Sequence, residues 1–327
     1  MQAQNITFIG LTRASLSFAL AIKEGAPTLN LIGYDVDDVL MSRAVEKKIL
    51  DLSESDLEKA LTVADIIIID AGPAETTNIF GLMGSTIQEH VVITHLSPKS
   101  QSYQKLADTL LSHGFYVGSA PVQSVHTFGP TPADPIEGAT ADLFRKSLFC
   151  LMPSAKVDEG AVATVRAIGQ LAGGTPYFID PYEYDTYMQA LDLLPQISQL
   201  ALFEALNSQK AWLDMTRLAG NRFATGTAGF ADRGDVIAQE IFSDKTSAVH
   251  WINQYISALE EIKRWVEVAD EQTVSELVSE RSFKRDIWLQ TRKDNQWDES
   301  PTSQVDKEGL RDMFMGNLFG RKRQNKG

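Results

Sequence analysis

The stretch "ITFIGLTRASLSFALA", residues 6–21, decides the fold of the first half of this 327-residue chain. A short apolar run ends at Gly10, and a pattern typical of a helix follows. A strand, a glycine turn and a helix in this order predict the phosphate-binding turn of a dinucleotide fold. Such a turn usually carries three glycines. Here only Gly10 is present, and Thr12 and Ser15 occupy the other two places.

The three places of this turn have different physical roles. Gly10 can form the tight turn, and Ser15 is small enough for the helix to pack on the strand. Thr12 puts a Cβ where the pyrophosphate would approach, although its hydroxyl can donate to a phosphate oxygen. The free N–H groups of the helix N-terminus favour an anion whatever the side chains are. Arg13 is interpreted either as a phosphate-binding cation or as a solvated loop arginine.

An acid and a second turn strengthen the prediction of a cofactor site. Asp35 ends the second expected strand, "NLIGYD", where an acid contacts the ribose hydroxyls of the adenosine half. An acid there also repels a 2′-phosphate, so NAD is favoured over NADP. The alternative is a strand-end turn residue. Gly72 and Pro73 close the third strand, where the far half of the cofactor would lie.

Alternation of strands and helices predicts an α/β fold with a Rossmann-type, doubly wound parallel sheet, followed by an all-α C-terminal domain. The run "ADIIIIDAG" indicates a strand buried on both faces. We expect a dinucleotide-binding domain over residues 1–155, a helical substrate and dimerisation domain over 156–295, and a polar linker with an amphipathic basic tail over 296–327. Pro195 lies inside a helical pattern and predicts a kink or an interruption.

Composition limits the class of partner. The net charge of −13 argues against nucleic acid or an anionic membrane. The single cysteine, Cys150, cannot form an internal disulfide, and no apolar run approaches the ~20 residues of a membrane span. The N-terminus has no signal-peptide pattern. We therefore expect a cytoplasmic protein without a metal site, whose partners are a small carboxylic acid and a second copy of the chain through the helical domain. The tail is either a frayed terminus or an arm for a partner.

Several segments, in order, resemble the prephenate/arogenate dehydrogenase family of tyrosine biosynthesis. They are "FIGLTRASLSFALAI", "LIGYDVD", "ADIIIIDAGPAETTNIF", "THLSPKSQS", "YVGSAP", "ATADLFRKSLFCLMP" and "FIDPYEYDTYMQALDLLPQISQLALFEAL". The resemblance covers about residues 5–270 and implies an NAD-dependent dehydrogenase. Ser97 and Lys99 match the serine and lysine of the family's aspartate–x–glycine–serine–x–lysine turn, although the turn is one residue shorter here. The resemblance makes both of them candidate catalytic residues.

The departures from the family fall on its chemistry. The family's histidine before a proline corresponds to Ala120, and its histidine–leucine–proline–histidine run corresponds to the segment from Leu193 to Gln196. A gapless match places Ala228 at the family's substrate-binding arginine. Oxidation of an alcohol needs a base, and a doubly charged substrate needs a cation, which alanine cannot supply.

Other residues are candidates for the missing roles. His126 and His95 are the candidate bases, and Gln196 and Arg222 are candidate substrate-binding residues, with Arg217 and Arg233 also near the lost arginine. For each, a surface residue or a satisfied polar group is the competing interpretation. The β-hydroxyacid dehydrogenases share this architecture and use a lysine and an asparagine four residues apart on a helix of the second domain. Asn207 and Lys210 have the wrong order and the wrong spacing for that pair, so this second family is rejected.

Three hypotheses remain open. The first is a working prephenate/arogenate-type dehydrogenase with a remodelled site. The second is an inactive or repurposed relative that binds a nucleotide or small acid without hydride transfer. The third is a structural role, in which the helical half dimerises and the tail binds a partner.

Overall fold

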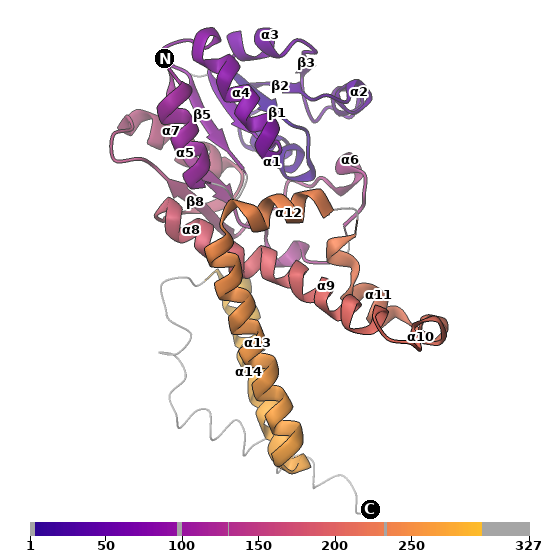
Figure 1. Ribbon diagram of the computed structural model, residues 1–327. Helices are drawn as coiled ribbons and strands as arrows, with labels where there is room; N and C mark the ends of the chain where they lie inside the picture. Colours follow the sequence, from indigo (N-terminus) through magenta and orange to yellow (C-terminus); the bar gives the residue numbers. More distant parts are fainter. Residues whose placement is uncertain (1–3, 97–99, 130, 232–233, 296–327) are drawn as a thin grey trace, which may run out of the picture.

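The computed structural model describes residues 4–96, 100–129, 131–231 and 234–295. The first half is a parallel sheet with strand order β3-β2-β1-β4-β5-β6, with helices between its strands (Figure 1). The reversal of order at β1 and β4 makes this a doubly wound Rossmann-type sheet, as predicted. Its strands are β1 (Asn5–Ile9), β2 (Asn30–Tyr34), β3 (Leu52–Ser53), β4 (Ile66–Ile69), β5 (Val92–His95) and β6 (Phe115–Tyr116). Its helices are α1 (Arg13–Gly25), α2 (Asp38–Glu46), α3 (Leu57–Thr62), α4 (Pro73–Thr86) and α5 (Ser100–Leu110).

Strand β4 lies at the centre of two hydrophobic cores. Ile66 and Ile68 pack in the core that contains α1, and Ile67 and Ile69 pack in the core that contains α4 and α5. Successive side chains of a strand point to opposite faces, so a run of four isoleucines has both faces to bury. The prediction of a strand covered on both sides is confirmed.

The stretch "FYVGSAP", residues 115–121, is divided between two sheets. The chain leaves the first sheet after β6 and forms β7 (Gly118–Pro121), which pairs antiparallel with β8 (Ser147–Met152). Strand β8 also pairs parallel with β9 (Gly174–Phe178) to give a second sheet. The polar loop between β7 and β8 contains two short helices, η1 (Val125–Thr127) and α6 (Pro135–Gly138), and α7 (Glu159–Leu171) connects β8 to β9.

After β9 the described chain is helical. Its elements are α8 (Pro181–Met188), η2 (Gln189–Leu193), α9 (Leu194–Asn207), α10 (Trp212–Leu218), α11 (Asn221–Gly226), η3 (Ala228–Phe230), α12 (Gly234–Ser243), α13 (Lys245–Val268) and α14 (Glu271–Asp294). Segment η2 is a π-helical turn directly before Pro195. Proline lacks an N–H and crowds the preceding turn, and the wider π-helical turn accommodates it. This turn is the interruption of the helix that Pro195 predicts. Among the described helices, none has both the length and the apolar character needed to cross a membrane.

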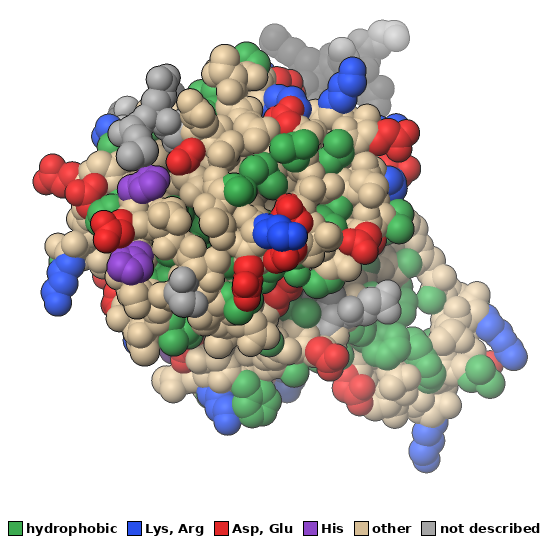
Figure 2. Space-filling model, turned by 90° about the horizontal axis from the view of Figure 1, so that it is seen from above, with side chains coloured by type: hydrophobic (Ala, Val, Ile, Leu, Met, Phe, Trp, Pro, Cys, Tyr) green, Lys and Arg blue, Asp and Glu red, His purple; other side chains and the backbone are tan. Residues whose placement is uncertain are grey.

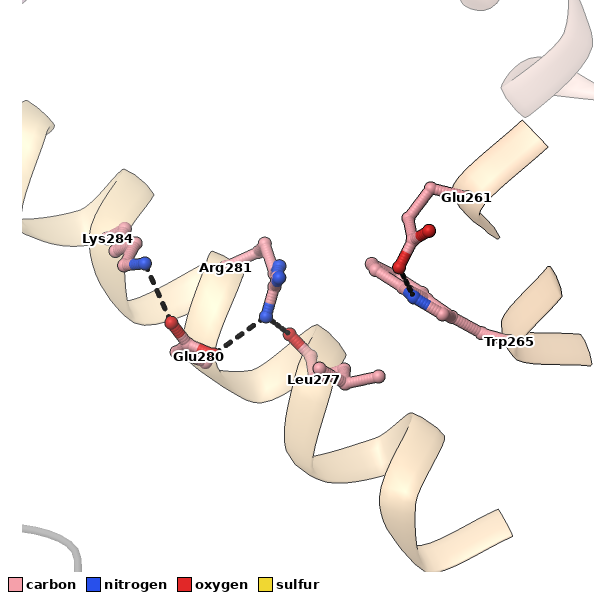
Figure 3. A network of polar contacts seen from close by, with 6 residues as sticks. All are labelled: Glu261, Trp265, Leu277, Glu280, Arg281 and Lys284. Carbon is pink, nitrogen blue, oxygen red and sulfur yellow. Dashed lines mark hydrogen bonds and ion pairs between the residues drawn. The ribbon is translucent and has the colours of Figure 1, made fainter. Parts of the chain in front are cut away.

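Helices α13 and α14 form a long antiparallel pair that extends away from the sheets (Figure 1). The Arg281 guanidinium of α14 lies 5.1 Å from the ring centroid of Trp265 on α13 and so links the two helices. Within α13, the Trp265 indole donates to Glu261 at 2.7 Å (Figure 3). Glu280 accepts from Lys284 at 2.7 Å on the same face. Such exposed pairs each add little stability.

Gly10 is the glycine on which the first sheet depends. Its φ is +88°, and a Cβ at this position would lie 2.2 Å from the backbone oxygen of Asp70. Gly10→Ala is expected to lower the free energy of unfolding by about 2 kcal/mol or more, because left-handed backbone strain and a backbone clash add together. Urea denaturation of the full chain measures this loss.

Gly81→Ala is the matched control. Gly81 lies on α4, where a Cβ meets no heavy atom within 4 Å. Alanine is favoured over glycine inside a helix, so this variant is expected to be more stable by about 0.5–1 kcal/mol. Equal effects of the two substitutions would contradict the importance of the Gly10 turn.

Candidate functional site

The Gly10 turn joins the carboxyl ends of β1 and β2. Gly10 N–H donates to the Tyr34 carbonyl (2.9 Å), and Leu11 N–H donates to Asp35 Oδ2 (2.7 Å). The other oxygen of Asp35 accepts from Asp37 N–H at 2.9 Å. A carboxylate has about four acceptor positions, so Asp35 keeps capacity for a ligand hydroxyl. The structure therefore brings the predicted turn and the predicted ribose-binding acid together.

Thr12 is the N-cap of α1. Its Oγ1 accepts from the backbone N–H groups of Ala14 (3.0 Å) and Ser15 (3.3 Å). The hydroxyl of Ser15 is buried and donates to the Gly10 carbonyl at 2.8 Å. Ser15 thus fastens the helix to the turn, and Thr12 covers N–H groups that a phosphate would otherwise meet.

Asp70, which sequence reasoning missed, completes this turn from β4. The Thr12 hydroxyl donates to Asp70 Oδ2, and the backbone N–H of Ser15 also donates to this carboxylate. Burial raises the pKa of Asp70 to about 6, against the opposing effect of these two hydrogen bonds. The available signal was an acid placed directly after the four isoleucines of a buried strand, at the end where parallel sheets bind ligands.

The side chain of Arg13 binds the loop around α6 and not the Gly10 turn. Its Nε donates to the Gly138 carbonyl (2.9 Å) and its Nη1 donates to Thr131 Oγ1 (3.1 Å). These bonds hold the loop before α6 against α1. A phosphate contact by Arg13 stays a prediction, and it would require these bonds to rearrange.

The carboxyl end of β4 leads into the open start of α4. Gly72 is the N-cap and Pro73 the first residue of this helix, and a Cβ at Gly72 would meet no heavy atom within 4 Å. Burial and the charge of Asp35 raise the pKa of Glu75 in the first turn of α4. Glu75 and Asp35 therefore face the same region, so the ends of β2 and β4 converge at one edge of the sheet.

His95, at the end of β5, is a buried and partnered residue. Its side chain is 0 % exposed, the Tyr116 hydroxyl is hydrogen-bonded to its Nδ1, and the Tyr103 ring lies edge-on at 4.9 Å. Burial is the main reason why the pKa of Tyr116 is raised well above its usual value. The structure therefore agrees with the competing interpretation of His95 as a satisfied polar group. Ser97 and Lys99, the predicted catalytic pair, lie outside the described residues.

Ala120 lies in β7 with 2 % of its surface exposed. It packs in an apolar cluster with Cys150, Met152 and Tyr184. Burial raises the pKa of the Cys150 thiol to about 11, which keeps it protonated. Among the described residues, this cluster offers no base at the place where the family resemblance puts a histidine.

The remaining predicted residues lie on different elements of the structure. His126 is exposed on η1, which packs on α14. Arg222 is exposed on α11, in the arm formed with α9 and α10 (Figure 1), and Ala228 follows in η3. Arg217 pairs with Asp214 at 3.2 Å in α10. Arg233 lies outside the described residues.

Gln196 is buried, with 6 % exposure, on the first turns of α9. Its Nε2 donates to the Asp192 carbonyl (3.1 Å), and its Oε1 has no hydrogen-bond partner among the described residues. A buried carbonyl oxygen that can still accept is consistent with a ligand contact. Its substrate-binding role stays a prediction.

A cavity of about 130 Å³ opens between α5 and the helical half of the chain. Because α5 follows β5, the cavity lies at the carboxyl edge of the parallel sheet. Four acids line it, of which Asp185, Asp192 and Glu240 each make further interactions. Its polar lining residues include Ser102, Tyr182, Asp185, Asp192, Glu240 and Asp244.

Comparison with known proteins identifies related sequences. Residues 18–177 match the family model of the prephenate dehydrogenase nucleotide-binding domain. A prephenate dehydrogenase of Bacillus subtilis (strain 168) is 24% identical over 281 residues, which cover 82% of this chain and 72% of that protein.

Solved structures share the fold. The prephenate dehydrogenase of A. aeolicus, in complex with hydroxyphenyl propionate and NAD+, has a TM-score of 0.74 at 19% identity and covers 87% of this chain and 98% of its own. The Synechocystis arogenate dehydrogenase has a TM-score of 0.66 at 18% identity, and the match covers 87% of this chain and 100% of that one. Residues 18–177 therefore belong to the prephenate dehydrogenase nucleotide-binding family, and the chain as a whole is a divergent relative of the prephenate/arogenate dehydrogenases.

Proposed function

We propose that this protein is an NAD-dependent dehydrogenase of prephenate/arogenate type with a remodelled active site. The observation that carries the proposal is the hydrogen bond from Leu11 N–H to Asp35, which sets the ribose-binding acid beside the Gly10 turn. The B. subtilis relative supports the substrate class, and the NAD+ in the A. aeolicus structure supports the cofactor. Bound NAD would supply the acceptor for a hydride from the substrate.

The chain's own residues fit the adenosine half of the cofactor. Asp35 would accept from the ribose hydroxyls, and the open space at Gly72 leaves room beside the start of α4. The fit at the pyrophosphate is less simple, because Thr12 and Asp70 already use the first N–H groups of α1. The proton acceptor has to lie elsewhere than Ala120, and Ser97, Lys99 and His126 remain the proposed catalytic candidates.

The alternative is a relative that binds a nucleotide or small acid without hydride transfer. One specific observation favours it: Ala120 is buried among apolar side chains, so the family's catalytic position has become part of a core. Calorimetric binding of NAD without any reduced nicotinamide, with either prephenate or arogenate, would select this alternative.

The first prediction for this function concerns cofactor choice. Purified protein is expected to reduce NAD with prephenate or arogenate, and to bind NADP at least about tenfold more weakly, because the Asp35 carboxylate repels a 2′-phosphate. Asp35→Asn is expected to reduce the ratio of the NADP dissociation constant to the NAD dissociation constant. Absorbance of reduced nicotinamide gives the rate, and calorimetry gives both dissociation constants.

Asp37→Asn is the matched control for charge. Asp37 lies two residues away and caps α2 by accepting from Val39 and Leu40. Its replacement is expected to leave the NAD preference unchanged. Absence of both NAD binding and turnover would refute the proposed function.

We also propose a homodimer formed through the helical half. Beyond η2, the described residues that are buried are Gln196, Ile237 and Ala248, although this region contains many apolar residues. Figure 2 shows hydrophobic side chains at the surface of the arm that projects from the body. Large apolar side chains remain exposed along α9, α10, α13 and α14, among them Leu202, Leu213, Leu218, Ile262, Val266 and Trp288. Exposure of many large apolar side chains supports an interface with another surface.

The prediction is that the full chain sediments as a dimer at micromolar concentration. Leu259→Asp with Ile262→Asp on α13, where both side chains are about half exposed, is expected to shift the mass toward the monomer. The control is Lys263→Glu with Glu267→Lys, an exchange of an exposed i,i+4 ion pair on the same helix. A monomer at all concentrations for the unmodified chain would disprove the dimer.

A further inference from the structure

The Asp70 carboxylate lies at the N-terminal end of α1, a position that dinucleotide folds reserve for a phosphate. It accepts from the Thr12 hydroxyl and from the Ser15 N–H. Its own backbone N–H donates to the Ile9 carbonyl (2.8 Å), and its backbone oxygen sits against Gly10. The backbone of Asp70 is therefore fixed against β1 and the Gly10 turn, which keeps its carboxyl group beside the N-terminal N–H groups of α1.

An ionised Asp70 competes with a cofactor pyrophosphate. Both are anions that need the same helix N–H groups, and two like charges in one partly desolvated place repel each other. A protonated Asp70 carries no charge and has an O–H that can donate to a phosphate oxygen. The protonation state of this one side chain thus decides whether the turn attracts or repels a dianionic ligand.

We propose that Asp70 is a proton-dependent selector of the cofactor site: its carboxylate fills the anion position of the α1 turn, and a dinucleotide binds with uptake of one proton at Asp70. The proton comes from solvent and remains on the carboxyl oxygen while the pyrophosphate is bound, so no bond in the cofactor changes. The proposal rests on the proposed use of NAD.

Each neighbouring element carries a charged or titratable group. These groups are Arg13 on α1, Asp35 after β2, Glu75 on α4 and His95 on β5. Arg13 is bonded to Gly138 and Thr131, and His95 is buried against Tyr116. Asp35 and Glu75 are acids that act on each other, since the charge of Asp35 raises the pKa of Glu75. The pKa of Asp70 is raised by burial and lowered by its bonds to Thr12 and Ser15. Thr12 and Ser15 donate hydrogen bonds to the Asp70 carboxylate.

Calorimetric titration of the full chain with NAD, at pH values from about 5.5 to about 8.5, tests the proposal. The dissociation constant is expected to rise about tenfold per pH unit above about 6, because one proton is linked to binding. Titration in two buffers of different ionisation enthalpy is expected to show uptake approaching one proton per NAD at the highest pH. Asp70→Asn is expected to bind NAD with a constant that does not change with pH.

Asp65→Asn is the matched control, because Asp65 stands at the other end of the same strand and binds the N–H groups of Gln4 and Asn5. It is expected to keep the pH dependence of the unmodified chain. In addition, the ligand-free Asp70→Asn protein is expected to melt above the unmodified chain at pH about 8 and to approach it toward pH about 5. An acid whose pKa is raised by folding costs stability as pH rises through that pKa.

Each result decides the matter. If the unmodified chain binds NAD equally at all pH values, the Asp70 proposal is overturned and the NAD proposal stands. If Asp70→Asn binds NAD but the unmodified chain does not at any pH, Asp70 is a permanent block and the proton-dependent selector is overturned. If neither protein binds NAD, both proposals fail. Parallel melting curves at all pH values would also overturn the selector.

Discussion

The close approach of β1 and β4 at Gly10 is the constraint on which the first half of the molecule depends. The backbone oxygen of Asp70 occupies the space of a Gly10 side chain, and the positive φ turns the chain directly into α1. The same turn fixes β2 through the Tyr34 carbonyl and Asp35. Three strand ends and one helix N-terminus are therefore positioned by one residue without a side chain, which is why the candidate cofactor site and the centre of the fold coincide.

This constraint has an electrostatic consequence. Asp35, Asp70 and Glu75 follow two central strands and converge on the edge of the sheet where α1 presents its N-terminal N–H groups. A helix N-terminus favours negative charge, and Thr12 and Asp70 already satisfy part of that preference inside the protein. The turn is thus complete without a ligand. Any anion that binds there has to displace or neutralise an internal partner.

The order of strands and helices in the first half could be predicted because each signal was local. The isoleucines of β4 and the acid after β2 could be interpreted within a few residues of chain. The branch of β7 into a second sheet could not, since it depends on β8 and β9, far along the sequence. The same limit applies to the site. Asp35 had a motif spacing, whereas Asp70 gains its role from Thr12, 58 residues away, and His95 is buried by Tyr103 and Tyr116.

The two halves of the chain also differ in how they reach stability. In the first half, two cores on opposite faces of β4 bury nearly every apolar strand residue, so its fold is self-sufficient. In the described helices beyond η2, the buried apolar cluster is reduced to Leu193, Ile237 and Ala248 with a few partly covered neighbours. Ordering a long helix pair costs conformational entropy that such a cluster does not offset. The exposed apolar faces of α13 and α14 are the surface on which the proposed dimer depends. The nucleotide end of the candidate site, by contrast, is built from hydrogen bonds within the single chain.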